Sequence, residues 1–152
     1  MRTINRNIAS AIIISRDKKI LMWKKKLDWW GVFSDCYHIP WWWVEEWETI
    51  EEAMIREVYE EVWLDVSKCR IKKLSELWEW TSEKILKNTW ERVLCHMIFN
   101  RFEVFVDKNS EDIGLKLWDE LVESKRFSNE ELKNAKQIPW WKEFFIKMGY
   151  IV

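Results

Sequence analysis

Acidic side chains and a single arginine are concentrated in residues 45–61, which hold eight glutamates. Among them, Glu57, Glu60 and Glu61 have the spacing i, i+3 and i+4, which places three carboxylates on one side of a helix. Like charges at this spacing repel one another, and a divalent cation relieves the repulsion. Mg²⁺ prefers hard oxygen ligands and is usually shared with substrate phosphates. The stretch therefore predicts a magnesium site, whereas the commoner alternative for a glutamate-rich helix is a solvated acidic face.

A helix is expected to carry these acids. Thr49 and Glu52 have the Thr-x-x-Glu spacing of a capping box, so the helix should begin at Ile50. Apolar residues then recur at helical spacing and predict the buried side of the helix. They are Met54, Ile55, Val58 and Val62.

The acids belong to a longer frame of fixed spacing. Trp42 is followed after five residues by Glu48 and, after seven more, by Arg56-Glu57-Val58. One residue later come Glu60-Glu61 and, after one more, Trp63-Leu64. This frame resembles the box of the Nudix hydrolases, which reads Gly-x5-Glu-x7-Arg-Glu-apolar-x-Glu-Glu-x-Gly-apolar. Every charged and apolar position matches, and both glycine positions are tryptophan.

The resemblance implies a Mg²⁺-dependent enzyme, with Mn²⁺ as a possible substitute, that hydrolyses a nucleoside diphosphate linked to another group by water attack at phosphorus. Glu57, Glu60 and Glu61 match the metal-binding acids of the family, and Glu57 also matches a position that activates water in some members. Arg56 and Glu48 match a pair that fixes the geometry of the loop and helix. The alternative is a nucleotide-binding or regulatory module that keeps the fold without turnover.

The order of the expected elements agrees with this resemblance. Strands are predicted at 7–15 and 18–23, joined by a turn at 16–18, and a short strand at 36–40. After the acidic helix come strands at 69–80 and 92–106 and helices at 128–136 and 142–148, with loops at 24–36, 81–91 and 107–118. We expect one α/β (α+β) domain over residues 1–152, an α/β/α sandwich built on a mixed sheet.

Composition restricts the partners and the location. The net charge of −1 and the pI of about 6.2 give no basic excess for nucleic acid. The apolar run at 8–14 is too short to cross a membrane. The three cysteines, Cys36, Cys69 and Cys95, lack zinc spacing and indicate reduced thiols. These features predict a cytoplasmic protein that binds neither nucleic acid nor membrane, and they do not indicate an oligomeric state. The resemblance implies a small-molecule partner, a nucleoside diphosphate derivative.

Tryptophan is abundant where glycine is expected. The chain has 14 Trp and 3 Gly, against roughly ten glycines in an average chain of this length. The predicted strands at 7–15 and 92–106 contain no tryptophan, whereas Trp63 and Trp90 fall where a helix end and a turn are predicted. A tryptophan is a poor choice for the left-handed backbone that ends a helix.

Our hypothesis is that many of these tryptophans are glycines in the cell, because some bacterial lineages read the UGA codon as glycine. Deliberate substitution and a natural aromatic binding loop are the alternatives. The literal chain should then be less stable and less active than its glycine counterpart. TGG codons at positions 41, 42, 47 and 63 of the coding DNA would exclude the hypothesis.

Other side chains are weaker candidates. Two histidines could bind metal and two cysteines could act as nucleophiles, but structural roles are commoner. Three aromatic residues could stack on a base, and one further acid outside the helix should complete the metal site. These residues are His38 and His96; Cys36 and Cys95; Tyr37, Phe33 and Phe99; and, for the acid, Glu103, Glu120 or Glu123.

Overall fold

The computed structural model describes residues 1–25, 36–75, 77–117, 121–137 and 139–151. Among these residues, strands come first, followed by one helix, further strands and two C-terminal helices, as the sequence predicts. Their order is β1 (Arg2–Ile14), β2 (Ile20–Lys25), β3 (Trp41–Trp43), α1 (Ile50–Val62), β4 (Arg70–Lys73), β5 (Trp78–Ile85), β6 (Arg92–Phe105), a short 3-10 turn η2 (Ser110–Asp112), β7 (Leu121–Phe127), α2 (Asn129–Asn134) and α3 (Pro139–Lys147).

The centre of the sheet is the parallel pair of β1 and β6, which runs in register from Arg2 beside Val93 to Ile14 beside Phe105. The order along the sheet is β4-β6-β1-β2-β7, with β3 added to β1 and β5 added to β6. All of these other pairings are antiparallel. The sheet is therefore mixed, as predicted.

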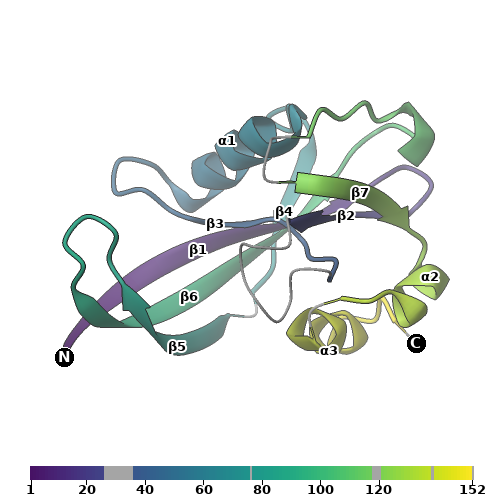
Figure 1. The fold of residues 1–152 in the computed structure, drawn as a ribbon. Coiled ribbons are helices and arrows are strands. Elements are labelled where there is room, and N and C mark those ends of the chain that lie inside the picture. Colours follow the sequence, from purple (N-terminus) through teal and green to yellow (C-terminus); the bar gives the residue numbers. More distant parts are fainter. Residues whose placement is uncertain (26–35, 76, 118–120, 138, 152) are drawn as a thin grey trace.

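Helices cover both faces of this sheet (Figure 1). Alternate residues of β1 point to opposite faces. Ala9, Ala11 and Ile13 belong to the core under α1. Ile12 and Ile14 belong to a second core with α2 and α3, which is built from Leu132, Trp141, Phe144 and Phe145. This arrangement confirms the predicted α/β/α sandwich.

The acidic helix has the predicted bounds, Ile50–Val62. The Thr49 hydroxyl accepts a hydrogen bond from the Glu52 N–H at 3.1 Å and donates one to the Glu52 carboxylate at 3.0 Å. Ala53, Met54 and Val58 are buried against the sheet. The cap and the apolar stripe therefore fix both the start of α1 and its rotation about its own axis.

Several strand predictions are wrong in detail. Residues 36–40 form two isolated bridges instead of a strand, and the strand lies in the tryptophan segment β3. The strand predicted at 69–80 is divided into β4 and β5, and β5 continues to Ile85 through the predicted loop because it pairs with β6. The strand β7 was not predicted from sequence. In each case the pairing partner decides the conformation more than the local residue types do.

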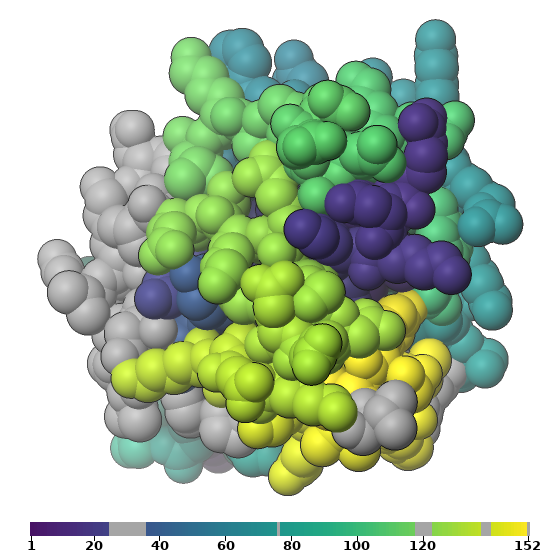
Figure 2. Space-filling model, turned by 90° about the vertical axis from the view of Figure 1, so that its right-hand side faces the viewer, coloured from purple at the N-terminus to yellow at the C-terminus, as the bar shows by residue number. Residues whose placement is uncertain are grey.

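The turn between β1 and β2 is anchored to the segment before β7. The Asp17 carboxylate accepts hydrogen bonds from the Ser15 hydroxyl at 2.5 Å, from the Ser110 N–H at 2.8 Å and from the Ser110 hydroxyl at 2.7 Å. The bond from Ser15, followed by those from Ser110, holds the pKa of Asp17 well below the usual range. Figure 2 shows this end of the molecule, with the turn in purple against the green segment. Among the described helices, none combines the length and the apolar character needed to cross a membrane.

The tryptophans occupy two kinds of position. Trp23 and Trp141 are buried core residues, so the prediction that tryptophans lie in turns is wrong for them. Trp63 and Trp90 have φ values of 58° and 57°, and in the described chain Lys18 is the other non-glycine residue with positive φ. Trp63 ends α1 in the left-handed conformation, as predicted. The backbone at positions 63 and 90 is therefore of the kind that favours glycine.

We expect Trp90→Gly to raise the free energy of unfolding by roughly 1 kcal/mol, because a left-handed backbone costs a side-chain-bearing residue about 1–2 kcal/mol. Trp90 is 80% exposed, so little packing is lost. The control is Trp47→Gly. Trp47 is 73% exposed, and its backbone does not have a positive φ. Denaturant unfolding of the two variants measures the difference. An equal effect of both substitutions would contradict backbone strain at position 90.

Candidate active site

Arg56 lies in the middle of α1 and forms hydrogen bonds with several neighbouring acids. Its Nη2 donates to Glu48 Oε1 at 2.7 Å and its Nε donates to Glu48 Oε2 at 2.9 Å. The Glu48 side chain is only 1% exposed. The charged hydrogen bonds hold the pKa of Glu48 below its ordinary value. This two-point contact fixes the loop that precedes α1 to the middle of the helix.

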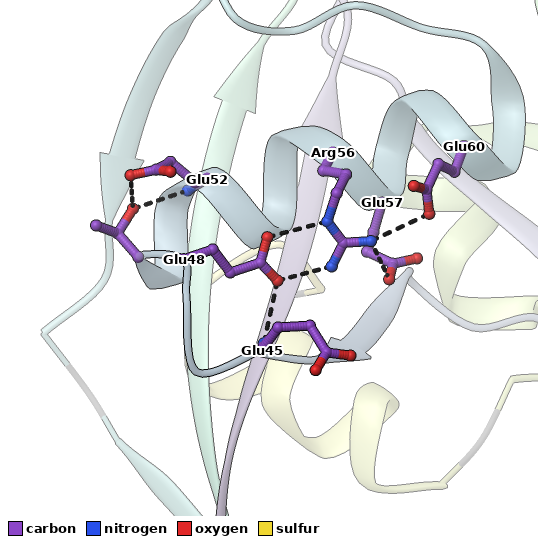
Figure 3. Close-up of polar contacts among 7 residues, drawn as sticks. Glu45, Glu48, Glu52, Arg56, Glu57 and Glu60 are labelled. Atoms are coloured by element: carbon purple, nitrogen blue, oxygen red, sulfur yellow. Dashed lines mark hydrogen bonds and ion pairs between the residues drawn. The ribbon is translucent and has the colours of Figure 1, made fainter.

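The same guanidinium collects two acids of the helix (Figure 3). Arg56 Nη1 donates to Glu57 Oε1 at 2.8 Å and to Glu60 Oε2 at 3.1 Å. Burial raises the pKa of Glu57, and this effect outweighs the opposing influence of Arg56. Three carboxylates of the predicted site therefore surround one positive charge.

The third predicted metal-binding acid is less accessible. Glu61 is 7% exposed, whereas the Glu60 side chain next to it is 56% exposed. Glu61 follows Val58 by three residues and precedes Val62, and both of these are buried against the sheet. The three acids lie on one side of α1, but their exposure differs. Glu60 faces solvent, whereas Glu61 lies where the helix meets the sheet.

The loop before the helix has a defined conformation. The Glu48 carboxylate accepts the Glu45 N–H at 3.1 Å, and the Val44 N–H bonds to the Asn7 carbonyl at 3.0 Å. Residues 41–43, which include the first glycine position of the box at Trp42, form β3 and pair with β1. Trp42 is buried there at 6% exposure. The turn lies further along, between β3 and α1.

The other candidate side chains do not join the Arg56 cluster. Glu103 accepts a hydrogen bond from the Tyr150 hydroxyl, and Glu123 accepts one from Tyr37 at 2.5 Å. Burial and the Glu123 carboxylate raise the pKa of Tyr37 to about 12. Glu120 and Phe33 lie outside the described residues.

The histidines and the remaining candidates have structural surroundings. His38 is buried with Nδ1 at 3.0 Å from the Ile39 carbonyl. His96 contacts Asn5 and Glu79 on the sheet. Phe99 packs in a small core and Cys36 is buried. Burial raises the pKa of the Cys69 and Cys95 thiols, which lowers their reactivity.

Comparison with known proteins decides the family. A family model described as the NUDIX domain matches residues 5–148. The chain belongs to the NUDIX domain family. A search of curated proteins found no match. The match places the Arg56 cluster within a NUDIX domain and agrees with the frame of glutamates in the sequence.

Solved structures share the NUDIX fold. A dihydroneopterin triphosphate pyrophosphohydrolase from E. coli superposes with a TM-score of 0.70 at 19% identity, covering 93% of this chain and 92% of that one. A MutT protein from Methanosarcina mazei Go1 gives 0.63 at 16%, covering 97% and 94%. An Ap4A hydrolase from C. elegans gives 0.60 at 13%, covering 95% of each chain. At these identities the likeness shows the fold.

The NUDIX box implies a divalent cation, and the donor set at α1 suits one chemically. Carboxylate oxygens are the ligands that Mg²⁺ and Mn²⁺ prefer. Glu57 and Glu60 already lie within 3.1 Å of one cationic nitrogen of Arg56. In the described part of the chain, however, no three His, Cys, Asp or Glu side chains are already grouped for a metal ion. The carboxylates therefore fit the cation by donor type, and Arg56 is the positive charge that Glu57 and Glu60 contact.

We expect Glu48→Gln to lower the free energy of unfolding at pH 7 by about 2 kcal/mol, because hydrogen bonds to charged groups contribute roughly 1.5–3 kcal/mol. The folded pKa of Glu48 is lowered, so its contribution is complete above the unfolded pKa of about 4.3 and is lost as the pH falls through the folded value.

Denaturant unfolding at pH 7 and at pH 3 measures this change, with the exposed Glu46→Gln as the control. A difference between Glu48→Gln and the parent that stays constant with pH would contradict the assignment of a charged Glu48–Arg56 pair.

Proposed function

We propose that the chain is a Mg²⁺- or Mn²⁺-dependent hydrolase of phosphoric anhydrides, acting on a nucleoside diphosphate linked to another group. The observation that carries the proposal is the Arg56 cluster, in which Glu48, Glu57 and Glu60 surround one guanidinium within the NUDIX box. Anionic substrates repel carboxylates, so an acidic site of this kind is useful for phosphate chemistry only together with a cation. Neighbours named as pyrophosphohydrolases and hydrolases support the same class of reaction.

In this proposal Glu57, Glu60 and Glu61 hold the cation, which when bound neutralises the diphosphate and lowers the pKa of coordinated water. Arg56 and Glu48 orient these acids by joining the loop to the helix. Glu57 accepts the proton of the attacking water. As the new bond from water oxygen to phosphorus forms, the bond from phosphorus to the bridging oxygen breaks. A nucleotide and a phosphorylated second group are then released.

The surroundings of Glu57 suit a proton acceptor. Its side chain is 21% exposed, and burial raises its pKa above the ordinary value of a glutamate. Arg56 Nη1 holds one oxygen, Oε1, at 2.8 Å. This contact fixes the direction of the carboxylate.

The second candidate function is a NUDIX-fold binding or regulatory module without turnover. The contacts of Arg56 with Glu57 and Glu60 favour it, because they must weaken before both carboxylates turn to a metal ion. Trp63 at the left-handed end of α1 favours it as well. Hydrolysis by the chain with glycine at positions 63 and 90 would decide for the enzyme.

The substrate is proposed to be a small molecule in the cytoplasm.

We expect Glu60→Gln to reduce kcat roughly 100-fold or more without unfolding the chain, because changes that only support a metal ligand already cost roughly 10- to 100-fold. Glu52→Gln is the matched control, since Glu52 lies on the same helix and, among the described residues, its carboxylate bonds to the Thr49 cap. Phosphate-product assays on ADP-ribose, Ap4A, oxidised nucleotides and a pterin triphosphate measure turnover. Chelation should abolish activity and added Mg²⁺ or Mn²⁺ should restore it. Metal-independent turnover, or full activity of Glu60→Gln, would overturn the proposal.

A further inference from the structure

The sheet has an open edge at β7. This strand is the last in the order β4-β6-β1-β2-β7, and among the described residues it pairs with no strand other than β2. Figure 1 shows β7 at the front of the sheet. An open edge carries unpaired backbone donors and acceptors, which can pair with a strand of another chain. The side chains along β7 therefore decide which partner this edge accepts.

Two exposed side chains of β7 carry opposite charges. Glu123 and Lys125 are exposed, and they lie on the same face of the sheet because they are two residues apart. One oxygen of Glu123 accepts the Tyr37 hydroxyl at 2.5 Å and the other lies 3.8 Å from the Lys24 ammonium, so the direction of this carboxylate is fixed. Lys125 Nζ lies 5.1 Å from the centroid of the Phe127 ring and forms no ion pair with another described residue.

A second copy of β7 fits this edge in one register. When two copies of a strand pair antiparallel about a two-fold axis, opposed residues point to the same face, so their numbers differ by an even number or are equal. With the axis at Ser124, Glu123 of each copy lies opposite Lys125 of the other. A shift of the axis by one residue in either direction opposes Glu123 to Glu123 or Lys125 to Lys125, and like charges directly opposite each other are destabilising.

The other strands with a single partner lack this self-complementarity. Strand β4 reads Arg-Ile-Lys-Lys and contains no acid. In β5, Glu79 and Glu83 are separated from Lys84 by odd numbers of positions, so a two-fold axis cannot oppose them to it. Strand β3 consists of three tryptophans. Among the described strands of this group, β7 is therefore the one that opposes unlike charges when it pairs with itself.

We propose that the chain forms a homodimer through antiparallel pairing of β7 with β7 of a second copy, about a two-fold axis at Ser124. Two Glu123–Lys125 ion pairs, one on each side of the axis, fix the register, and the two sheets join into one. The surface contains no tryptophan, so it is the same whether tryptophan or glycine stands at the disputed positions. The proposal goes beyond the proposed function and does not depend on it.

Sedimentation equilibrium over a dilution series measures this association. We expect the parent to reach twice the monomer mass of 18.9 kDa and to dissociate on dilution. Lys125→Glu opposes like charges twice per dimer and should raise the dissociation constant about tenfold or more. The matched control is Lys72→Glu, which makes the same change at an exposed lysine of β4, the strand at the other end of the sheet. It should leave the dissociation constant within about twofold.

A mixture of two variants tests the register itself. Glu123→Lys should also be impaired alone, because it opposes two lysines twice per dimer. In an equimolar mixture with Lys125→Glu, each chain opposes its two like charges to the unlike charges of the other, so dimers should form again at parental concentrations. Thermal melts verify that each variant is folded. Because Lys125→Glu removes no described ion pair, its comparison with Lys72→Glu is informative even where Glu123→Lys does not fold.

A cysteine at the axis gives a second measurement that does not involve the charges. Opposed Cα atoms in an antiparallel pair are roughly 4.5–5.5 Å apart, which is within the range of a disulfide. Oxidised Ser124→Cys should therefore form a covalent dimer on a non-reducing gel, beyond any formed by the parent or by Thr3→Cys, an exposed position on β1.

Three results would each overturn the β7 dimer. They are a parent that is monomeric at every concentration, equal effects of Lys125→Glu and Lys72→Glu, and equal cross-linking of Ser124→Cys and Thr3→Cys. Failure of the folded mixture to form dimers would overturn the register centred at Ser124. None of these outcomes bears on the proposed hydrolase, which is tested by turnover.

Discussion

The candidate site depends on the contact between Arg56 and Glu48. The pair joins the loop before α1 to the middle of the helix by two charged hydrogen bonds. With the Glu48 side chain 1% exposed, loss of Arg56 leaves a carboxylate that is poorly solvated. The remaining bonds of Arg56 then determine where Glu57 and Glu60 lie, so one guanidinium positions acids from both sides of the helix start.

The sheet gives this pair a rigid support. The register of β1 and β6 extends over the full length of β1, and α1 lies on its Ala9, Ala11 and Ile13 face. Small side chains at two of these three positions allow a helix to approach the strand closely.

The sequence predicts α1 well because its information is local. The Thr49 cap, the apolar stripe and the glutamate spacing all lie within one segment, and the helix has the expected bounds. The family, the sandwich and the association of Glu48 with Arg56 were predicted from the same frame. The local sequence does not show which acids contact Arg56. In the structure Arg56 contacts Glu57 and Glu60, whereas Glu61 is buried toward the sheet. Strands β3, β5 and β7 depend on distant partners, and local residue types did not predict their bounds.

The tryptophans show where a residue conflicts with its backbone. Trp23 and Trp141 are buried as aromatic residues usually are. Trp63 and Trp90 instead have φ near 60° and are 58% and 80% exposed. The Trp63 ring stacks on Tyr59 and has the Lys116 ammonium 4.5 Å from its centroid, but both tryptophans retain the strain of a left-handed backbone. The fold therefore separates tryptophans that suit their positions from those whose positions favour glycine.

The most direct test of this account is a titration with Mn²⁺ followed by NMR, because the paramagnetic ion broadens nearby amide signals. The account predicts broadening centred on residues 56–61 and the loop before α1. It also predicts that Glu57→Gln together with Glu60→Gln removes the broadening, whereas Glu52→Gln retains it. Absence of broadening, or broadening centred elsewhere that survives the double substitution, would contradict a metal site on α1.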